Sequence, residues 1–487
     1  MGRAPLACVG LSTNRQPTES MVSARLLAPN RVRAMADLTA VYNSFDAEDA
    51  LPADDTERYV DLSAVRGNMR IAHRLVKRIE LAGQQPSYHL LTGHVKCGKT
   101  TELNRTAQQL EQRGYATVVF DVTKEAQTYA FDYTAVLLVL AGQVVTQLGA
   151  RQPPIKMAGH GAKKLAELLI EKEITVGAGI SGEAGAKVEA EIAPGLLASL
   201  LGKFGLGVEL KGGFQRNREI TYKIERDTQA FQDALQELIL DAAERVHERG
   251  HRGLVVICDG SDKLSQRPPG VPPEAYQDLH VSLFVEHRAD LCSLPCHVIY
   301  SVPISIQANL GPDWGNSPEF VPAIPVNTLA GTDALYAEEG RRLLSEVVER
   351  RLRQFELSID QFFADGALFE RLVSASGGHI SDLLLMVRDA LVEAQIDERE
   401  RIAEPDVERA ILTRALEYNR LIESSHLPVL SEIAQTQLRP ANGDLYRELV
   451  SRRLTLEYLC GDEIRVDLHP LVAASDAYRR WHGAGVR

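Results

Sequence analysis

The chain has 487 residues, of which 45% are hydrophobic and 25% are charged, and its formal net charge is −12 at pH 7. The composition is that of an ordinary globular protein, and the length exceeds what one core supports, so about two to four domains are expected. The negative balance argues against a surface that is basic overall, so any nucleic-acid footprint would have to be local.

The first 34 residues contain five Arg and a single acid, Glu19. This bias is typical of a transit peptide, and an overlong start with Met21 or Met35 as the true first residue explains it equally well. We expect residues 1–40 to be a disordered extension. The six cysteines are scattered without a paired C-x-x-C, and no apolar run reaches the roughly 18 residues that span a bilayer. We therefore expect a cytoplasmic protein with reduced thiols and no membrane contact.

The most informative segment is 93–101, which reads Gly-His-Val-Lys-Cys-Gly-Lys-Thr-Thr and matches the phosphate-binding P-loop pattern. A strand is predicted before it at 87–92, and apolar residues at helical spacing follow it. In such a loop Lys99 reaches the β- and γ-phosphates, and the Thr100 hydroxyl is placed to bind Mg²⁺. The predicted contacts to a nucleoside triphosphate are Gly93, His94, Val95, Lys96, Cys97, Gly98, Lys99, Thr100 and Thr101.

Continuous apolar runs separated by helical patterns indicate a parallel sheet covered on both faces. The further predicted strands are 115–122, 254–258, 297–302 and 324–329, and the intervening long helices are 131–148 and 231–249. The predicted fold class is α/β, a P-loop nucleoside triphosphatase sheet over residues 41–335. A Gly-rich insertion at about 152–228 reads as a mobile surface insertion or as a surface for a partner or for self-assembly.

From residue 336 the pattern turns helical, with helices predicted at 341–355, 366–375, 381–394 and 405–418. We interpret 336–420 as a helical lid. In 421–487 a helix at 444–452 precedes strands at 454–459 and 464–468, an order typical of a winged helix. Residues 404–487 carry 11 Arg, no Lys and 13 Asp or Glu. This tally gives no electrostatic footprint for DNA, so a protein-contacting wing is favoured.

A P-loop requires a second acidic site to hold Mg²⁺ and to orient the attacking water. Asp259 closes the hydrophobic strand 254–258 and is the predicted second ligand of Mg²⁺. Asp262 lies three positions further on, where it either polarises the attacking water or belongs to a simple surface turn.

Residues 256–262, Val-Ile-Cys-Asp-Gly-Ser-Asp, resemble the corresponding block of STAND ATPases, which are signal-transducing relatives of AAA+ proteins. Many of these have a glutamate after the second aspartate; Lys263 stands here instead, which favours slow hydrolysis. The resemblance implies that Arg66 and Gly67 lie against adenine, although their order is reversed. It also implies that Ser301 is a polar sensor of the γ-phosphate, against the alternative of an ordinary serine at a strand end.

Residues 377–383 resemble the lid block of the same family, but no arginine stands at the sensor position, and Arg388 is a candidate substitute. His469 resembles the nucleotide-sensing histidine of STAND winged helices, against the favoured alternative of a packed histidine. The resemblance implies an ATP- and Mg²⁺-dependent conformational switch that hydrolyses ATP slowly, acts in regulation or defence against phages, and contacts a protein partner or a second copy. The alternative is a DNA-associated AAA+ ATPase of the initiator or transposition type, in which the winged helix binds DNA.

Overall fold

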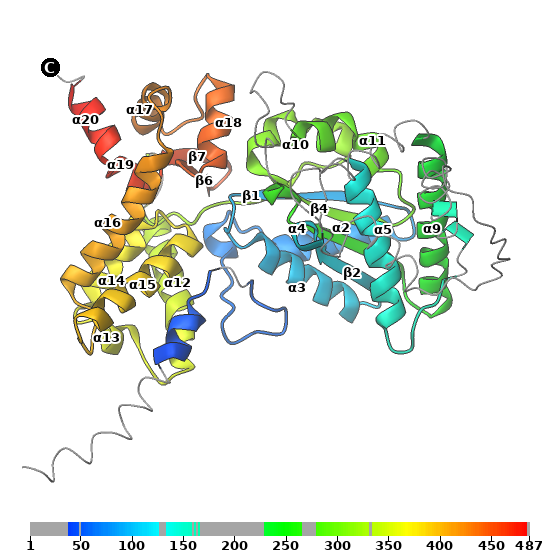
Figure 1. Ribbon diagram of the computed structural model, residues 1–487, viewed down its shortest axis with the longest axis horizontal. Coiled ribbons are helices and arrows are strands. Elements are labelled where there is room, and N and C mark those ends of the chain that lie inside the picture. The colour runs from blue at the N-terminus through cyan, green and yellow to red at the C-terminus, as the bar shows by residue number, and fades with distance from the viewer. Residues whose placement is uncertain are drawn as a thin grey trace, which may run out of the picture.

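The computed structural model describes residues 38–47, 50–125, 133–157, 160–161, 164–165, 228–264, 279–330 and 334–484. Most of the predicted N-terminal extension and most of the predicted Gly-rich insertion lie outside these residues. Figure 1 shows an α/β domain on one side, a helical lid on the other, and a third, C-terminal part beside both.

The α/β domain is built on a five-stranded sheet with the order β2-β3-β4-β1-β5, and every neighbouring pair is parallel. The strands are β1 (Tyr88–Gly93), β2 (Ala116–Asp121), β3 (Leu254–Asp259), β4 (His297–Pro303) and β5 (Glu319–Val321). Because all five run in one direction, their carboxyl ends meet at one edge of the sheet, where ligands bind in open α/β folds. This confirms the predicted α/β P-loop fold class.

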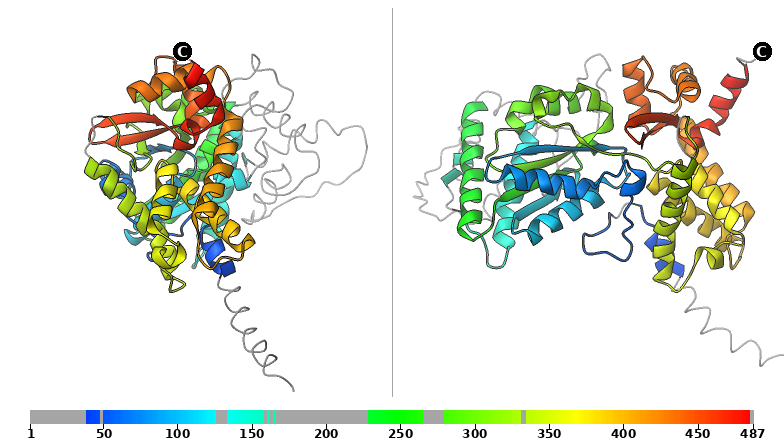
Figure 2. Two further views of the ribbon diagram at one scale, coloured as in Figure 1. Left: turned by 90° about the vertical axis from the view of Figure 1, so that its left-hand side faces the viewer. Right: turned by 180° about the vertical axis from the view of Figure 1, so that it is seen from behind.

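Helices cover both faces of the sheet, as Figures 1 and 2 show. Helices α2 (Ile71–Ala82) and α3 (Lys99–Gln112) pack on one face, with Leu91 and Ile257 in their core. Helices α5 (Tyr133–Ala150) and α9 (Thr228–Glu248) pack on the other, with Leu90 and Val256. Adjacent residues of one strand thus serve opposite cores, and this explains the apolar runs without alternation. The shorter helical segments of this domain are η2 (Ser63–Val65), α4 (Val122–Glu125), η3 (Ser261–Lys263), α10 (Leu279–Val281), η5 (Ser282–Glu286), α11 (Arg288–Leu291), η6 (Ile304–Asn309) and η7 (Pro312–Trp314).

By length and composition, α5 is the one described helix that is apolar enough to cross a membrane. Its residues Leu137, Leu140, Val144 and Leu148 are fully buried in the core shared with β2 and α9. An apolar helix enclosed by protein on most sides is a core helix, so this composition reflects burial within the fold.

The fifth strand differs from the prediction. The structure places it at Glu319–Val321, whereas the predicted run 324–329 is not a strand. Ile324 and Val326 are buried among the lid helices, and Leu329 packs near the C-terminal hairpin. The apolar character of this run therefore comes from contacts between parts of the chain and not from the sheet.

The lid consists of α12 (Ala334–Arg353), α13 (Ile359–Phe362), α14 (Gly366–Ala375), α15 (Ile380–Ile396) and α16 (Glu404–Leu421). Four of these correspond to the predicted lid helices. Val41 and Phe45, near the start of the described chain, are buried in the same core as the lid helices. An N-terminal segment thus completes the lid.

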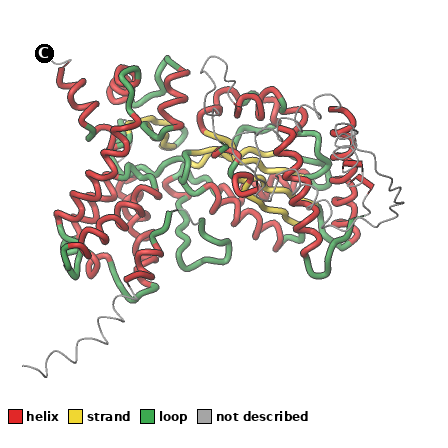
Figure 3. Tube along the Cα trace, in the orientation of Figure 1, coloured by secondary structure: helices red, strands yellow, loops and turns green. Residues whose placement is uncertain are grey.

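The C-terminal part has helices α17 (His426–Thr436) and α18 (Gly443–Ser451), followed by an antiparallel hairpin of β6 (Thr455–Cys460) and β7 (Glu463–Leu468), then α19 (Pro470–Ala473) and α20 (Asp476–Ala484). Helices followed by a hairpin are the predicted winged-helix-like arrangement, and Figure 3 shows the hairpin as a pair of strands apart from the main sheet. Its core also contains Ile304 and Phe320 of the α/β domain. The C-terminal part therefore shares one core with the domain that carries the P-loop.

Candidate nucleotide site

The P-loop joins β1 to α3 and holds its lysine in a buried ion pair. Lys99 Nζ donates to the carbonyls of Gly93 at 2.9 Å and His94 at 2.7 Å, and lies 2.9 Å from Asp262 Oδ2. Burial opposes the charge of Lys99, but the Asp262 carboxylate raises the pKa of the ammonium group. Burial likewise opposes ionisation of Asp262, but Lys99 holds the pKa of that carboxyl below its usual value. Lys99 is therefore kept protonated, which is the form that binds a phosphate.

Thr100 and Asp259 form the predicted metal-binding pair. The Thr100 hydroxyl donates to Asp259 Oδ2 at 2.5 Å, while Asp259 Oδ1 is buried without a hydrogen-bond partner among the described residues. Burial, and then the charge of Asp262, raise the pKa of Asp259. A hydroxyl and an uncompensated carboxylate oxygen are hard oxygen ligands, which suit Mg²⁺. The residues present thus fit the predicted cation.

Ser301 lies on β4 beside Asp262. Its hydroxyl donates to Asp262 Oδ1 at 3.1 Å, and the hydroxyl of Ser261 donates to the Ser301 carbonyl. Asp262 is thereby fixed between Lys99 and Ser301 at the carboxyl end of the sheet. The serine predicted to sense phosphate is thus hydrogen-bonded to the aspartate predicted to orient water. Lys263 also lies at the edge of this site, with its Nζ 3.6 Å from Asp121 Oδ2.

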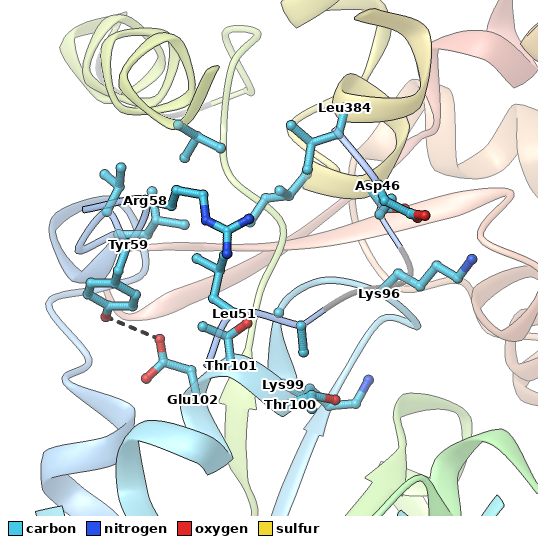
Figure 4. A pocket seen from close by; sticks show the side chains of 18 of the residues that line it. Asp46, Leu51, Arg58, Tyr59, Lys96, Lys99, Thr100, Thr101, Glu102 and Leu384 are labelled. Atoms are coloured by element: carbon cyan, nitrogen blue, oxygen red, sulfur yellow. Dashed lines mark hydrogen bonds between the residues drawn. The ribbon is translucent and has the colours of Figure 1, made fainter. Parts of the chain in front are cut away.

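A cavity lies between the P-loop and the lid (Figure 4). Of the predicted nucleotide contacts, those that line it are Arg66, Lys96, Gly98, Lys99, Thr100 and Thr101. The opposite walls come from the N-terminal segment and the lid. They include the apolar Val60, Leu62, Val347 and Leu384, the basic Arg58 and Arg351, and the polar Asp46 and Ser381. A phosphate cradle at one end and apolar walls at the other suit a nucleotide.

The remaining predicted contacts, Gly93, His94, Val95, Cys97 and Gly67, are not among the residues that line this cavity. Cys97 is buried, with its Sγ 3.5 Å from the Val321 carbonyl oxygen. Gly67, with φ of 64°, packs against the C-terminal hairpin, where an added Cβ would lie 2.5 Å from Leu459 Cδ2. The backbone at Gly67 thus lets the hairpin approach the P-loop.

His94 and Val95 connect the P-loop to the other two parts of the chain. His94 Nε2 accepts a hydrogen bond from the Glu457 amide on β6 at 2.8 Å. The His94 ring is fully buried, and this burial, together with His379 and Lys99, lowers its pKa well below the ordinary value, so the ring is neutral. The carbonyl of Val95 faces His379 Nε2 of the lid at 2.8 Å.

An aspartate that the sequence analysis did not single out organises this junction. Asp382 Oδ2 lies 2.8 Å from His379 Nδ1 and 3.2 Å from His469 Nε2, and accepts from the Tyr418 hydroxyl at 2.8 Å. Burial opposes ionisation of Asp382, but the two histidines hold its pKa well below the usual range. Tyr418 and His469 stack, with ring centroids 4.4 Å apart. We call Asp382, His379, His469 and Tyr418 the Asp382 cluster.

His469 is thus a packed member of the Asp382 cluster and makes no hydrogen bond to the P-loop among the described residues, as expected for the packed-histidine alternative. Arg388, the proposed substitute sensor, lies 3.7 Å from Asp46 Oδ1 and over the Tyr42 ring, and does not line the cavity. In its place Arg351 of α12 lines the cavity. Its position on an otherwise ordinary amphipathic helix gave no sequence signal.

No protein-family model matches the sequence, and no curated protein matches it. Among solved structures, the chain is similar to a Walker-type ATPase of Pyrococcus abyssi, with 14% identity, a TM-score of 0.38, and coverage of 88% of this chain and 99% of that one. It is also similar to the ORC1 protein of Aeropyrum pernix in complex with DNA, with 15% identity, a TM-score of 0.36 and coverage of 88% and 97%. A third is Drosophila ORC bound to DNA, with 9% identity, a TM-score of 0.36 and coverage of 96% of each chain.

Proposed function

We propose that this chain is a nucleotide-dependent conformational switch of the AAA+ and STAND kind, with ATP and Mg²⁺ as its ligands. The proposal rests on the observation that the P-loop is hydrogen-bonded both to the C-terminal hairpin and to the lid. His94 accepts from the Glu457 amide of the C-terminal hairpin, and Val95 bonds to His379 of the lid. A loop that must rearrange around phosphates thus carries the contacts that close the structure.

The chemistry of the site follows from the ion pair of Lys99 and Asp262. Lys99 and Thr100 would hold the phosphates and Mg²⁺ together with Asp259, and the bound cation would neutralise phosphate charge. When Lys99 turns from Asp262 toward phosphate, Asp262 keeps the hydrogen bond from Ser301 and is left as a buried carboxylate able to orient water. Movement of the Lys99 ammonium also releases its bond to the His94 carbonyl. Nucleotide binding is thereby coupled to the residue that holds the hairpin.

Slow turnover is part of the proposal. Lys263 stands where the resembled family often has glutamate and pairs with Asp121 at 3.6 Å, so Asp262 is the acid left for orienting water. Slow hydrolysis would set how long the protein stays in its ATP-bound form. A role in regulation or in defence against phages is implied by the resemblance alone.

Amide hydrogen exchange at residues 455–460 tests the switch directly, because the Glu457 amide is bonded to His94 and not to the partner strand. We expect ATP with Mg²⁺ to accelerate exchange there in the wild type. The Lys99→Ala variant, which lacks the phosphate-binding ammonium, should show no acceleration. Wild-type protein that binds ATP while exchange at Glu457 stays constant would refute the switch.

The second candidate function is a DNA-associated AAA+ ATPase, which the helix–helix–hairpin order of α17, α18 and β6–β7 favours. Two of the similar solved structures contain DNA, but at these TM-scores the likeness does not decide between the candidates. In a winged helix the helix before the hairpin commonly enters the major groove. Here α18 lies beside η6 of the α/β domain, so DNA binding through α18 would require opening first.

Salt-dependent DNA binding that appears only with ATP would support this candidate. A flat response to salt and nucleotide would remove it. Because the hydrogen-exchange experiment does not involve DNA, the two candidates are separable.

A further inference from the structure

Three buried side chains around the cavity have polar atoms without a hydrogen-bond partner in the part of the chain that the structure describes. They are Arg66 Nε, Arg351 Nε and Ser381 Oγ, and their residues are 3%, 6% and 3% exposed. They come from three separate elements, namely the segment before α2, helix α12 and helix α15. Buried polar groups are normally paired, so three unpaired atoms around one cavity are available to hydrogen-bond a polar ligand.

Arg351 is the strongest of the three, because Ser381 is uncharged and Arg66 already interacts with the Glu102 carboxylate and donates from Nη2 to the Cys97 carbonyl. Its Nη1 donates only to the Val347 carbonyl of its own helix, at 2.8 Å, and no ion pair joins it to an acid among the described residues. Burial first, and then the nearby Arg58, lower the pKa of Arg351 to about 10, so it remains protonated at neutral pH. A buried cation without a partner is costly to the folded state, and this cost requires an explanation.

Arg351 lies on α12 of the lid, which packs against η2 of the segment before the P-loop, and not on an element that forms the phosphate cradle. The charges that act on it are those of Arg58 and Asp55, from the same N-terminal segment. Asp55 is already paired with Arg58 at 2.5 Å. The apolar residues that line the same cavity include Val60, Leu62, Val347 and Leu384. Apolar walls suit a flat ring, and a guanidinium has only donors, so it can recognise only acceptor atoms.

We propose that Arg351 binds the base of the nucleotide by donating hydrogen bonds to its ring acceptor atoms, with Arg66 and Ser381 beside it. This rests on the proposed function, since it assumes that the triphosphate lies on the P-loop. Arg351 is then the residue that makes the site bind a nucleotide more tightly than a bare triphosphate. The free protein bears the cost of the unpaired guanidinium, and the ligand relieves it.

The test compares, by calorimetric titration with Mg²⁺, the affinities of ATP, ribose 5-triphosphate and inorganic tripolyphosphate for wild type and Arg351→Met. We expect ATP to bind about 10- to 100-fold more weakly to the variant, from the loss of hydrogen bonds to a charged group. Tripolyphosphate and ribose 5-triphosphate should bind equally to both proteins. Arg353→Met is the matched control, because Arg353 is an exposed arginine two residues further along the same helix, paired with Glu349.

Thermal unfolding of the ligand-free proteins shows whether the variants are folded, so that a loss of ATP affinity can be assigned to the binding site. Arg351→Met should unfold at the same or a higher temperature than wild type, because it removes an unpaired buried charge. Arg351→Lys, which keeps the charge but loses the planar fork, should recover only part of the ATP affinity.

An equal loss for tripolyphosphate would show a long-range charge effect and overturn the proposal. A loss for ribose 5-triphosphate would place the contact on the sugar and overturn the assignment to the base. Unchanged ATP affinity in folded Arg351→Met would also overturn it. Failure of the proposed function looks different, because wild-type protein would then bind neither ATP nor tripolyphosphate.

Discussion

Replacing Asp382 with asparagine tests the closed form most sharply. The side chain keeps its shape, but the carboxylate that faces His379, His469 and Tyr418 loses its charge. Each of these three contacts, at 2.8, 3.2 and 2.8 Å, changes from a bond to a charged group into a neutral one. The contacts of Asp382 with His379 and Tyr418 lie within the lid, whereas those with His469 and with Arg453, at 3.7 Å, join the lid to the C-terminal part. Bonds to charged groups contribute about 1 kcal/mol more than neutral ones, so the closed form should lose about 2 kcal/mol.

A loss of about 2 kcal/mol corresponds to about a 30-fold shift in the equilibrium between closed and open forms. The assay is hydrogen exchange of the Glu457 amide without nucleotide, where protection should fall about 30-fold. Asp389→Asn is the control on the same helix; Asp389 is 3.6 Å from Arg414 and partly exposed, so its loss should cost less than about 1 kcal/mol.

The pH dependence has a defined sign. The folded-state pKa of Asp382 is depressed, so its contribution is present above the ordinary aspartate value and is lost only as pH falls through the lower folded value. Wild type and Asp382→Asn should therefore differ at pH 7 and at pH 5 and converge only in stronger acid. Equal Glu457 protection in folded Asp382→Asn and wild type at pH 7 would refute the role of the Asp382 cluster.

Three further outcomes follow from the site and its junction. Asp259→Asn should abolish the Mg²⁺-dependent part of ATP binding in calorimetry. Because burial raises the pKa of Asp259, the Mg²⁺ dependence of wild-type binding should weaken as pH falls toward that pKa. Unchanged Mg²⁺ dependence in the variant would contradict the assignment of Asp259 as a ligand. His94→Ala should increase Glu457 exchange about 10-fold through loss of one buried hydrogen bond, with global thermal stability little changed; full protection in the variant would contradict the contact. Gly378→Ala should lower the unfolding temperature markedly, because an added Cβ would lie 1.6 Å from the Ile324 carbonyl oxygen at φ of 80°, whereas Gly443→Ala, with open space around it, should not.

The sequence predicted the parts of the site that are local in the chain. Lys99 and Thr100 lie in one loop, and Asp259 and Asp262 follow one strand. A strand-to-helix turn and a strand end fix such positions, so spacing is enough to place them. The fold class was accessible for the same reason, since apolar runs without alternation require a sheet that is covered on both faces.

The Asp382 cluster could not be predicted in this way. Its members are separated by up to 90 positions in the chain and are brought together by packing of the lid on the C-terminal hairpin. Arg351 gave no signal either, because an arginine on an amphipathic helix is normally solvent-exposed. The run 324–329 was misread as a strand because burial between domains and burial within a sheet produce the same apolar pattern.

The backbone of the hairpin has one more consequence. Ala323, just after the edge strand β5, donates its amide to the Glu457 carbonyl at 2.9 Å and pairs in parallel with Tyr458. The hairpin therefore caps an edge of the main sheet. If the hairpin leaves, two unsatisfied strand edges become accessible together, one on the sheet and one on β6, and each can accept a strand from another molecule. Opening would then be coupled to protein concentration, so that the same event that frees the C-terminal part also supplies complementary surfaces for polymerisation.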